Sequence, residues 1–355
     1  MAHIEAKGLV KHYGSVKAVL GIDFEVADGE FVAILGPSGC GKSSTMRMIA
    51  GLEEITDGTI SFNGKPVNDV RARDRNVAMS FENYALYAPL TIYENIAFPL
   101  RSAGKNDSQV DQRVREIAKK MELTDMLHIK PGGLSSGQAQ RVGLARALVR
   151  EPSVFLLDEP ISHLDTRQRY RMRRFIKSLH QEFGYTMIYV THDQEEALAL
   201  ADRVMVMSDG EIQQMDIPEV IYMRPKNMFV AGFVGEPPIN FLPFKSLGQR
   251  KIIIQDNEIS VPDELATALE NIGPEGIAAI RPHFMSLGSQ SPIVLQGTAF
   301  ITEELQDHNE IFIDIGNLKI SLIAPPHQRP DRGETVTVSI DPKQLLLFPN
   351  HEKSH

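Results

Sequence analysis

Short apolar runs alternate with amphipathic stretches over residues 1–235. Apolar positions recur at helical spacing in residues 109–121 and 138–150, which predicts two amphipathic helices. This alternation predicts an α/β unit over residues 1–235, with a helix-rich insertion at about 88–150. Three early runs rich in aliphatic and β-branched residues predict strands, at 4–10, 21–26 and 31–35.

The pattern changes at residues 235–240, where Gly, Pro and Asn cluster and predict a domain boundary. Beyond it, short β-prone runs recur at roughly 10–15 residues with Pro and Gly between them, which predicts a small all-β barrel or sandwich over residues 236–355. The last five residues, 351–355, are expected to be disordered. The β-prone runs are 251–255, 277–280, 293–301, 310–315, 319–323 and 335–340.

Length and composition indicate a globular protein with more than one domain. A chain of 355 residues suggests two or three domains, and 42% hydrophobic residues are ample for their cores. A net charge of −9 gives the whole chain no cationic footprint, so no nucleic-acid partner is expected. The N-terminus shows no secretion signal, and no apolar run approaches about 18 residues. The chain is therefore expected to be soluble, and other subunits would provide any membrane spans.

Residues 36–43 read Gly-Pro-Ser-Gly-Cys-Gly-Lys-Ser, which is the phosphate-binding pattern G-x-x-x-x-G-K-[ST]. The pattern follows a predicted strand and precedes a helix that is predicted to begin at Ser44. Backbone N–H groups of such a loop surround phosphate oxygens, Lys42 reaches the β- and γ-phosphates, and the Ser43 hydroxyl can ligate Mg²⁺. The residues expected to contact ATP are Ser38, Gly39, Cys40, Gly41, Lys42, Ser43 and Ser44.

Cys40 is the only cysteine, so no internal disulfide forms and a reducing compartment is expected. Its place beside a helix N-terminus predicts a lowered pKa and a reactive thiol. The alternative is a small residue that the glycine-rich loop tolerates, and the sequence leaves both open.

Four apolar residues at 154–157 are followed by Asp158 and Glu159. This predicts a buried strand that carries two carboxylates at its C-terminal end, where α/β folds bind ligands. Asp158 is expected to hold Mg²⁺ through its water shell, and Glu159 to polarise the attacking water as a general base. The alternative is an exposed Asp-Glu pair of no function, which the upstream phosphate-binding loop disfavours.

The run Leu-Ser-Ser-Gly-Gln at 134–138 precedes a helix that contains Gln-Arg and Ala-Arg-Ala-Leu. Here the chain strongly resembles the ATP-binding subunits of ABC transporters, whose signature reads Leu-Ser-Gly-Gly-Gln. The resemblance implies that Ser135, Gly137 and Gln138 contact, in trans, the γ-phosphate held by an opposing subunit. Ser136 stands where the family has glycine, which either weakens closure of the dimer or is tolerated.

Further family motifs follow in order along the chain. By resemblance, Tyr13 stacks on adenine, His192 senses the γ-phosphate, and residues 162–165 form the loop that links the two ATP sites. Glu82 stands where the family has a glutamine that touches Mg²⁺. A glutamate can still ligate Mg²⁺, but when ionised it cannot donate a hydrogen bond, and it adds negative charge near Glu159.

Residues 279–283 and 338–348 resemble the C-terminal β-domain of importer ATPases of the maltose-type carbohydrate class. The resemblance implies an OB-like domain, and an ATPase that energises import of a sugar, a polyol such as glycerol, or a related solute. It implies two transmembrane permease subunits and a second ATPase subunit, identical or not. It further implies an extracytoplasmic solute-binding protein, contacted indirectly, and a peripheral position on the cytoplasmic face of the inner membrane.

Two other functions compete with an importer ATPase. A soluble ABC ATPase acting on ribosomes or DNA usually carries two ATPase units or a long coiled coil, whereas this chain has one P-loop and no sustained heptads. A regulatory module that binds nucleotide without hydrolysis is supported by Glu82 and Ser136, and the pair Asp158-Glu159 argues against it. The same two departures also suggest a mixed dimer with a non-identical ATPase subunit.

Overall fold

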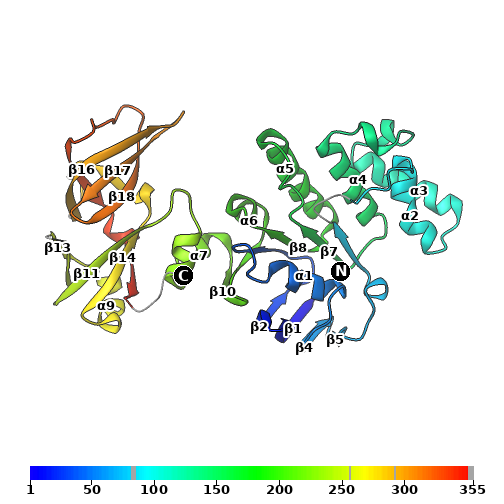
Figure 1. The fold of residues 1–355 in the computed structure, drawn as a ribbon, viewed down its shortest axis with the longest axis horizontal. Coiled ribbons are helices and arrows are strands. Elements are labelled where there is room, and N and C mark those ends of the chain that lie inside the picture. Colours follow the sequence, from blue (N-terminus) through cyan, green and yellow to red (C-terminus); the bar gives the residue numbers. More distant parts are fainter. Residues whose placement is uncertain (81–84, 256, 292, 351–355) are drawn as a thin grey trace. The chain divides into compact units, whose positions relative to one another are not determined.

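The computed structural model describes residues 1–80, 85–255, 257–291 and 293–350, so the tail at 351–355 lies outside the described residues (Figure 1). The chain forms two compact units, Met1–Pro218 and Glu219–His355. Over the described ranges, no helix is both long and apolar enough to cross a membrane.

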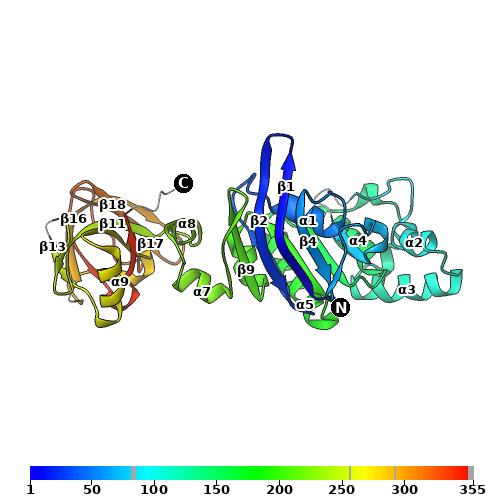
Figure 2. The same ribbon diagram turned by 90° about the horizontal axis from the view of Figure 1, so that it is seen from below.

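Two sheets form the framework of the first unit (Figure 2). The larger has the strand order β10-β9-β3-β8-β7-β6; β10 is antiparallel to β9, and the other strands are parallel. The smaller is antiparallel, in the order β2-β1-β4-β5. The strands are β1 (Ile4–Tyr13), β2 (Val16–Val26), β3 (Phe31–Leu35), β4 (Asp57–Phe62), β5 (Lys65–Pro66), β6 (Val77–Ser80), β7 (Val154–Asp158), β8 (Thr186–Thr191), β9 (Arg203–Ser208) and β10 (Glu211–Asp216).

Burial on both faces explains why the central strands read as continuous apolar runs. Every residue of β3 and β8 is buried, as expected for parallel strands that are covered on both sides. Helix α1 (Lys42–Ala50) shares one core with β1, β2 and β4 of the small sheet and β3, β7, β8 and β9 of the large sheet. It ends at Gly51, whose φ of 73° is the left-handed conformation of a helix C-cap.

Three helices form the predicted insertion: α2 (Ile92–Ser102), α3 (Asp107–Lys120) and α4 (Ser136–Leu148). Each begins at a side-chain cap, Thr91, Asn106 or Ser135, that accepts a hydrogen bond from the first helical turn. The three helices pack on one another, and α4 also packs on β6. Two other helices, α5 (Thr166–Phe183) and α6 (Gln194–Leu200), pack together, and α6 packs on β3 and β8.

The second unit contains two five-stranded antiparallel sheets that share one core. Their orders are β13-β12-β11-β14-β20 and β15-β19-β16-β17-β18. Three short helices accompany them: α7 (Pro218–Met223), α8 (Met228–Phe233) and α9 (Ala266–Ile272). The strands are β11 (Asn240–Gly248), β12 (Lys251–Ile254), β13 (Asn257–Ser260), β14 (Glu275–Ile280), β15 (Met285–Leu287), β16 (Ile293–Glu304), β17 (Asn309–Ile315), β18 (Leu318–Ala324), β19 (Thr335–Ile340) and β20 (Leu346–Pro349).

The two units divide after Pro218, earlier than the turn-rich segment at 235–240 suggests. The buried guanidinium of Arg281 donates to the carbonyl oxygens of Tyr222 and Val234, at 2.7 and 2.6 Å, and lies 3.7 Å from the centre of the Tyr222 ring. These contacts fasten the segment that carries α7 and α8 to the end of β14. The sequence does not predict helix α9, because only one of its seven residues, Leu269, is buried.

Asn240 joins the two sheets of the second unit. Its side-chain amide donates to the carbonyl oxygen of Ser321 on β18 at 2.8 Å and accepts from the Ser321 N–H at 2.8 Å. Both residues are buried, so neither backbone group of Ser321 has water as a substitute partner.

Substitution Asn240→Ala is expected to lower the free energy of unfolding of the second unit by about 2–4 kcal/mol, because it leaves two buried backbone groups unpaired. Scanning calorimetry of the full chain measures this change. The matched control is Asn257→Ala, whose only described side-chain bond is a long one of 3.5 Å to Ile254. Equal effects of the two substitutions would contradict the prediction.

Candidate nucleotide-binding site

The loop at 36–41 connects the buried end of β3 to the first turn of α1. Gly41 has a φ of 105°, and a Cβ there would come within 2.5 Å of the carbonyl oxygen of Ala18, so only glycine fits. Gly39 has a φ of 83°, and a Cβ there would meet nothing within 4 Å. The loop is thus closed against the protein at Gly41 and open at Gly39, as a phosphate cradle requires.

Lys42 lies buried inside this loop. Its ammonium group donates to the carbonyl oxygens of Gly36 and Pro37, at 2.8 and 2.9 Å. The adjacent Ser38 and Gly39 are exposed. A positive charge therefore lies directly under the exposed part of the loop, with its position fixed by the backbone.

The prediction of a reactive Cys40 is wrong. Its side chain is only 3% exposed, and burial raises the pKa of the thiol, although Lys42 acts in the opposite direction. A raised pKa keeps the thiol protonated and unreactive. The structure supports the alternative of a small residue packed beneath the loop.

Three parallel strands end at the same edge of the large sheet as the loop. Asp158 is the last residue of β7, and its carboxylate lies 3.5 Å from the Ser43 hydroxyl, the donor in this pair. Glu159 follows, and its carboxylate lies 3.1 Å from Nδ1 of His192, which comes just after β8. The sequence placed these four residues in three separate segments, and the fold brings them together.

Glu159 has an unusual backbone conformation, with a φ of 43°. A non-glycine residue in this region costs about 1–3 kcal/mol and needs support from its surroundings. The support comes from its N–H, which donates to Val190 at 2.9 Å, and from its carbonyl oxygen, which accepts from the Ser162 hydroxyl at 3.0 Å. The fold thus keeps Glu159 in a backbone conformation that a non-glycine residue disfavours, and so holds its carboxylate at the sheet edge.

Tyr13 lies near the first turn of α1. Its hydroxyl is 3.4 Å from the hydroxyl of Ser44, and the ammonium of Lys11 lies 4.7 Å from the centre of its ring. The ring is 42% exposed. This arrangement leaves an aromatic surface available beside the phosphate loop.

The signature residues lie at the start of α4, in the helical insertion. Ser135 and Gln138 form a reciprocal cap: the Gln138 N–H donates to the Ser135 hydroxyl at 3.3 Å, and the Ser135 N–H donates to the Gln138 side chain at 2.9 Å. Over the described part of the chain, no hydrogen bond joins Ser135, Gly137 or Gln138 to the phosphate loop. Glu82, the remaining predicted metal ligand, lies outside the described residues.

Sequence reasoning missed a buried polar network behind this edge. Glu196 on α6 is 2% exposed and accepts hydrogen bonds from the hydroxyls of Tyr189 and Thr191, both at 2.8 Å. Arg169 on α5 lies 3.7 Å from Glu196 and 3.5 Å from Asp193, and donates to the carbonyl oxygen of Ser162 at 3.5 Å. The available signal was a glutamate at an apolar position of a short helix, next to the buried Ala197.

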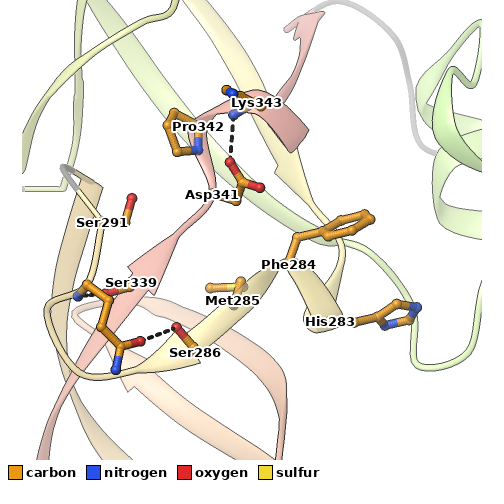
Figure 3. A pocket seen from close by; sticks show the side chains of 10 residues that line it. His283, Phe284, Met285, Ser286, Ser291, Ser339, Asp341, Pro342 and Lys343 are labelled. Atoms are coloured by element: carbon orange, nitrogen blue, oxygen red, sulfur yellow. Dashed lines mark hydrogen bonds between the residues drawn. The ribbon is translucent and has the colours of Figure 1, made fainter.

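A separate cavity of about 510 Å³ lies in the second unit, lined by His283, Ser286, Asp341 and Lys343 among others (Figure 3). Its hydroxyl groups serve the fold: Ser339 donates to Gly288 at 2.6 Å, and Ser291 bonds to Ile340. None of the predicted ATP-binding residues lines it.

Burial raises the pKa of Glu196 above its ordinary value near 4.5. At pH values between the unfolded pKa and the raised folded pKa, the folded chain binds more protons than the unfolded chain, so this group makes the free energy of unfolding fall as pH rises. Glu196→Gln cannot titrate. The stability of the wild type relative to that of this variant is therefore expected to be largest at and below pH 4.5 and to decrease as the pH rises above that value.

Urea unfolding of both chains across this pH range measures the difference. The matched control is Glu195→Gln, the same chemical change at the neighbouring exposed carboxylate. A pH-independent difference for Glu196→Gln would show that the buried carboxylate does not titrate as expected.

Comparison with known proteins agrees with this geometry. A family model described as "ABC transporter" matches residues 19–162. The sulfoquinovosyl glycerol transport ATP-binding protein SmoE of Agrobacterium fabrum is 40% identical over 98% of both chains. The trehalose/maltose import ATP-binding protein MalK of Thermococcus litoralis is 41% identical over 98% of both chains.

A solved structure extends the likeness to the fold. It shows a dimeric, post-hydrolysis state of the ATP-binding cassette MJ0796 bound to ADP and Pi. It is 30% identical with a TM-score of 0.54, and the match covers 61% of this chain and 98% of that one. With relatives of 40% identity along nearly its whole length, the chain belongs to the family of ABC transporter ATP-binding proteins.

Proposed function

We propose that this chain is the ATP-hydrolysing subunit that energises import of a small solute through a membrane ABC transporter. The observation that carries the proposal is the meeting of the phosphate loop, Asp158, Glu159 and His192 at one edge of a parallel sheet. Ligands of α/β folds bind at this edge. Relatives named for sugar-related transport support the import function.

ATP would bind with its phosphates on the loop and the N-terminus of α1, where N–H groups and the helix dipole favour negative charge. Lys42 would neutralise the β- and γ-phosphates, and Tyr13 would stack on the adenine. The open position at Gly39 and the exposed Ser38 would let the loop wrap the phosphates. The proposed contacts of the same subunit are Tyr13, Ser38, Gly39, Cys40, Gly41, Lys42, Ser43 and Ser44.

The site fits Mg²⁺ as a partner of ATP rather than as a resident ion. Over the described residues, no group of three or more His, Cys, Asp or Glu side chains could hold a metal alone. The Ser43 hydroxyl and the Asp158 carboxylate, 3.5 Å apart, are hard oxygen donors, and nucleotide phosphates and water complete such sites. Ser43 and Asp158 would hold the ion, with Glu82 as a further proposed ligand, and the ion would neutralise phosphate charge.

Glu159 would act as the general base. Its carboxylate would take a proton from water as the water oxygen attacks the γ-phosphorus, and the bond from that phosphorus to the β–γ bridging oxygen would break to leave ADP. His192, 3.1 Å from the same carboxylate, would orient it and contact the γ-phosphate. The supported backbone of Glu159 fixes the base before the substrate arrives.

The signature would act in trans. Ser135, Gly137 and Gln138 begin a helix whose N-terminus favours an anion, and they make no bond to the loop of their own chain among the described contacts. A second ATPase subunit, identical or not, would therefore bring its phosphate loop to this helix, and two ATP molecules would lie between the subunits. The dimeric cassette among the structural relatives supports this arrangement.

The permease would dock on a groove of about 750 Å³ beside the helical insertion. Tyr87 and Phe98 line it with ring centres 4.9 Å apart, and both are exposed, at 43% and 45%. Arg146 of α4 donates to the carbonyl oxygen of Ala85 and lies against the Tyr87 ring. An exposed aromatic pair in a groove suits a protein helix as its occupant.

Membership of the family supports a proposal for the rest of the assembly. Two permease subunits would span the membrane, with this chain peripheral on its cytoplasmic face. An extracytoplasmic binding protein would deliver a sugar, a polyol such as glycerol, or a related solute. The C-terminal unit, with its two antiparallel sheets, would be the OB-like domain of the maltose-type importers.

Glu159→Gln is expected to lower the Mg-ATP turnover of the assembled complex by about 10²–10⁴-fold while leaving ATP binding intact, because only the proton acceptor is lost. The measurement is phosphate release at saturating ATP, alongside ATP binding. The matched control is Glu182→Gln, an exposed glutamate on α5 that pairs with Lys120. Equal and negligible rates in the unmodified and Glu159→Gln complexes would remove the enzyme assignment.

Replacing Tyr87 and Phe98 together by alanine is expected to reduce retention of permease subunits by at least about tenfold, because paired aromatic anchors dominate such interfaces. Intact-mass analysis of the proteins that copurify with the tagged chain from gently solubilised membranes gives the ratio. Tyr170→Ala, at another exposed tyrosine, is the control. Unchanged retention would exclude the groove as the docking site.

A further inference from the structure

Ser136 is the first residue of α4 and the position where the signature departs from glycine. Its two neighbours in the cap, Ser135 and Gln138, bond to each other, so their side chains are already engaged. The Ser136 hydroxyl takes no part in that cap. Its partner lies elsewhere in the chain.

The partner is Gln168 on α5. The Ser136 hydroxyl donates to Oε1 of Gln168 at 2.9 Å, in a partly buried position. A Cβ on Gly137 would lie 3.3 Å from the same oxygen, so this side chain covers both of the first two residues of α4. A glycine at position 136 has no hydroxyl. This bond therefore depends on the serine that stands where the family signature has glycine.

Gln168 is itself fixed at the start of α5. Its N–H donates to the side chain of Asp165, the N-cap of that helix, at 2.8 Å. The next residue, Arg169, donates to the carbonyl oxygen of Ser162. The Ser136–Gln168 bond thus ties the first turn of α4 to the loop at 162–165, which follows the catalytic edge directly.

We infer that Ser136 and Gln168 form a latch that sets the orientation of the signature turn relative to this loop. Ser136 is then a positioning residue, and its hydroxyl is not a ligand of the phosphate. The N–H groups of Ser136 and Gly137 belong to the first turn of α4 and so have no acceptor within the helix. The latch sets the direction in which these N–H groups point. This inference rests on the proposed function, because the orientation matters only where the turn meets the ATP of an opposing subunit.

A double-mutant cycle tests the latch in the complete transporter complex, purified from membranes through a tag on this chain. The variants are Ser136→Ala, Gln168→Leu and both together, and the readouts are kcat and KM for Mg-ATP. Each single change is expected to lower kcat by about three- to tenfold, the equivalent of one hydrogen bond, with KM within about twofold. The double variant is expected to match the singles, because both remove the same bond.

Amide hydrogen exchange of the purified full chain provides a readout that does not depend on catalysis. Both single substitutions are expected to speed exchange at residues 136–140 to the same extent. The matched control is Gln181→Leu, the same chemical change at an exposed position on α5, which should alter neither exchange there nor kcat.

The outcomes separate the latch from its rivals. A fall in kcat for Ser136→Ala alone would identify the hydroxyl as a phosphate ligand, and additive effects or no effects would show that the two residues act independently. Each of these overturns the latch while leaving ATP hydrolysis in place. No Mg-ATP turnover in the unmodified complex would overturn the proposed function together with the latch.

Discussion

The parallel pairing of β3, β8 and β7 is the constraint on which the candidate site depends. Parallel strands bring their carboxyl ends to one edge, so the phosphate loop after β3, the carboxylates after β7 and His192 after β8 must meet. The burial of the strands on both faces keeps this edge rigid, because their apolar side chains form part of a single core with α1. The left-handed backbone of Glu159 persists because this framework supports it on both sides.

Buried polar contacts connect the segments around the edge. Glu196 and Arg169 form a charged pair in which the carboxylate also receives two hydroxyl hydrogen bonds. Such a pair contributes little net stability, because desolvation of the charges offsets their attraction. Its geometric effect is larger: Arg169 bonds to the loop at 162–165 and pairs with the segment after His192 at the same time. Together with the bond between Ser136 and Gln168, these contacts connect the start of α5 to the signature turn, to the loop at 162–165 and to the segment after His192.

The second unit is held together differently from the first. Its two antiparallel sheets enclose their own core, and single buried polar side chains fix the irregular parts. Asn240 joins the sheets, and Arg281 holds the segment with α7 and α8 to β14. A buried side chain that satisfies several backbone carbonyls specifies one arrangement, because every alternative leaves those groups unpaired. The boundary between the units therefore lies at the start of α7, after Pro218, whereas the turn-rich segment at 235–240 is internal to the second unit.

The sequence alone determined the features that depend on neighbours along the chain: the phosphate loop between β3 and α1, the strand that ends in Asp158, the start of α4 at the signature, and the run of strands after residue 240. Local spacing and turn residues suffice for these, because each lies within one element. Only the tertiary structure decided the pKa of Cys40, the partner of Ser136, the role of Arg169 and the attachment of α7 to β14. These depend on burial and on contacts between residues up to 59 positions apart, which a linear pattern does not encode.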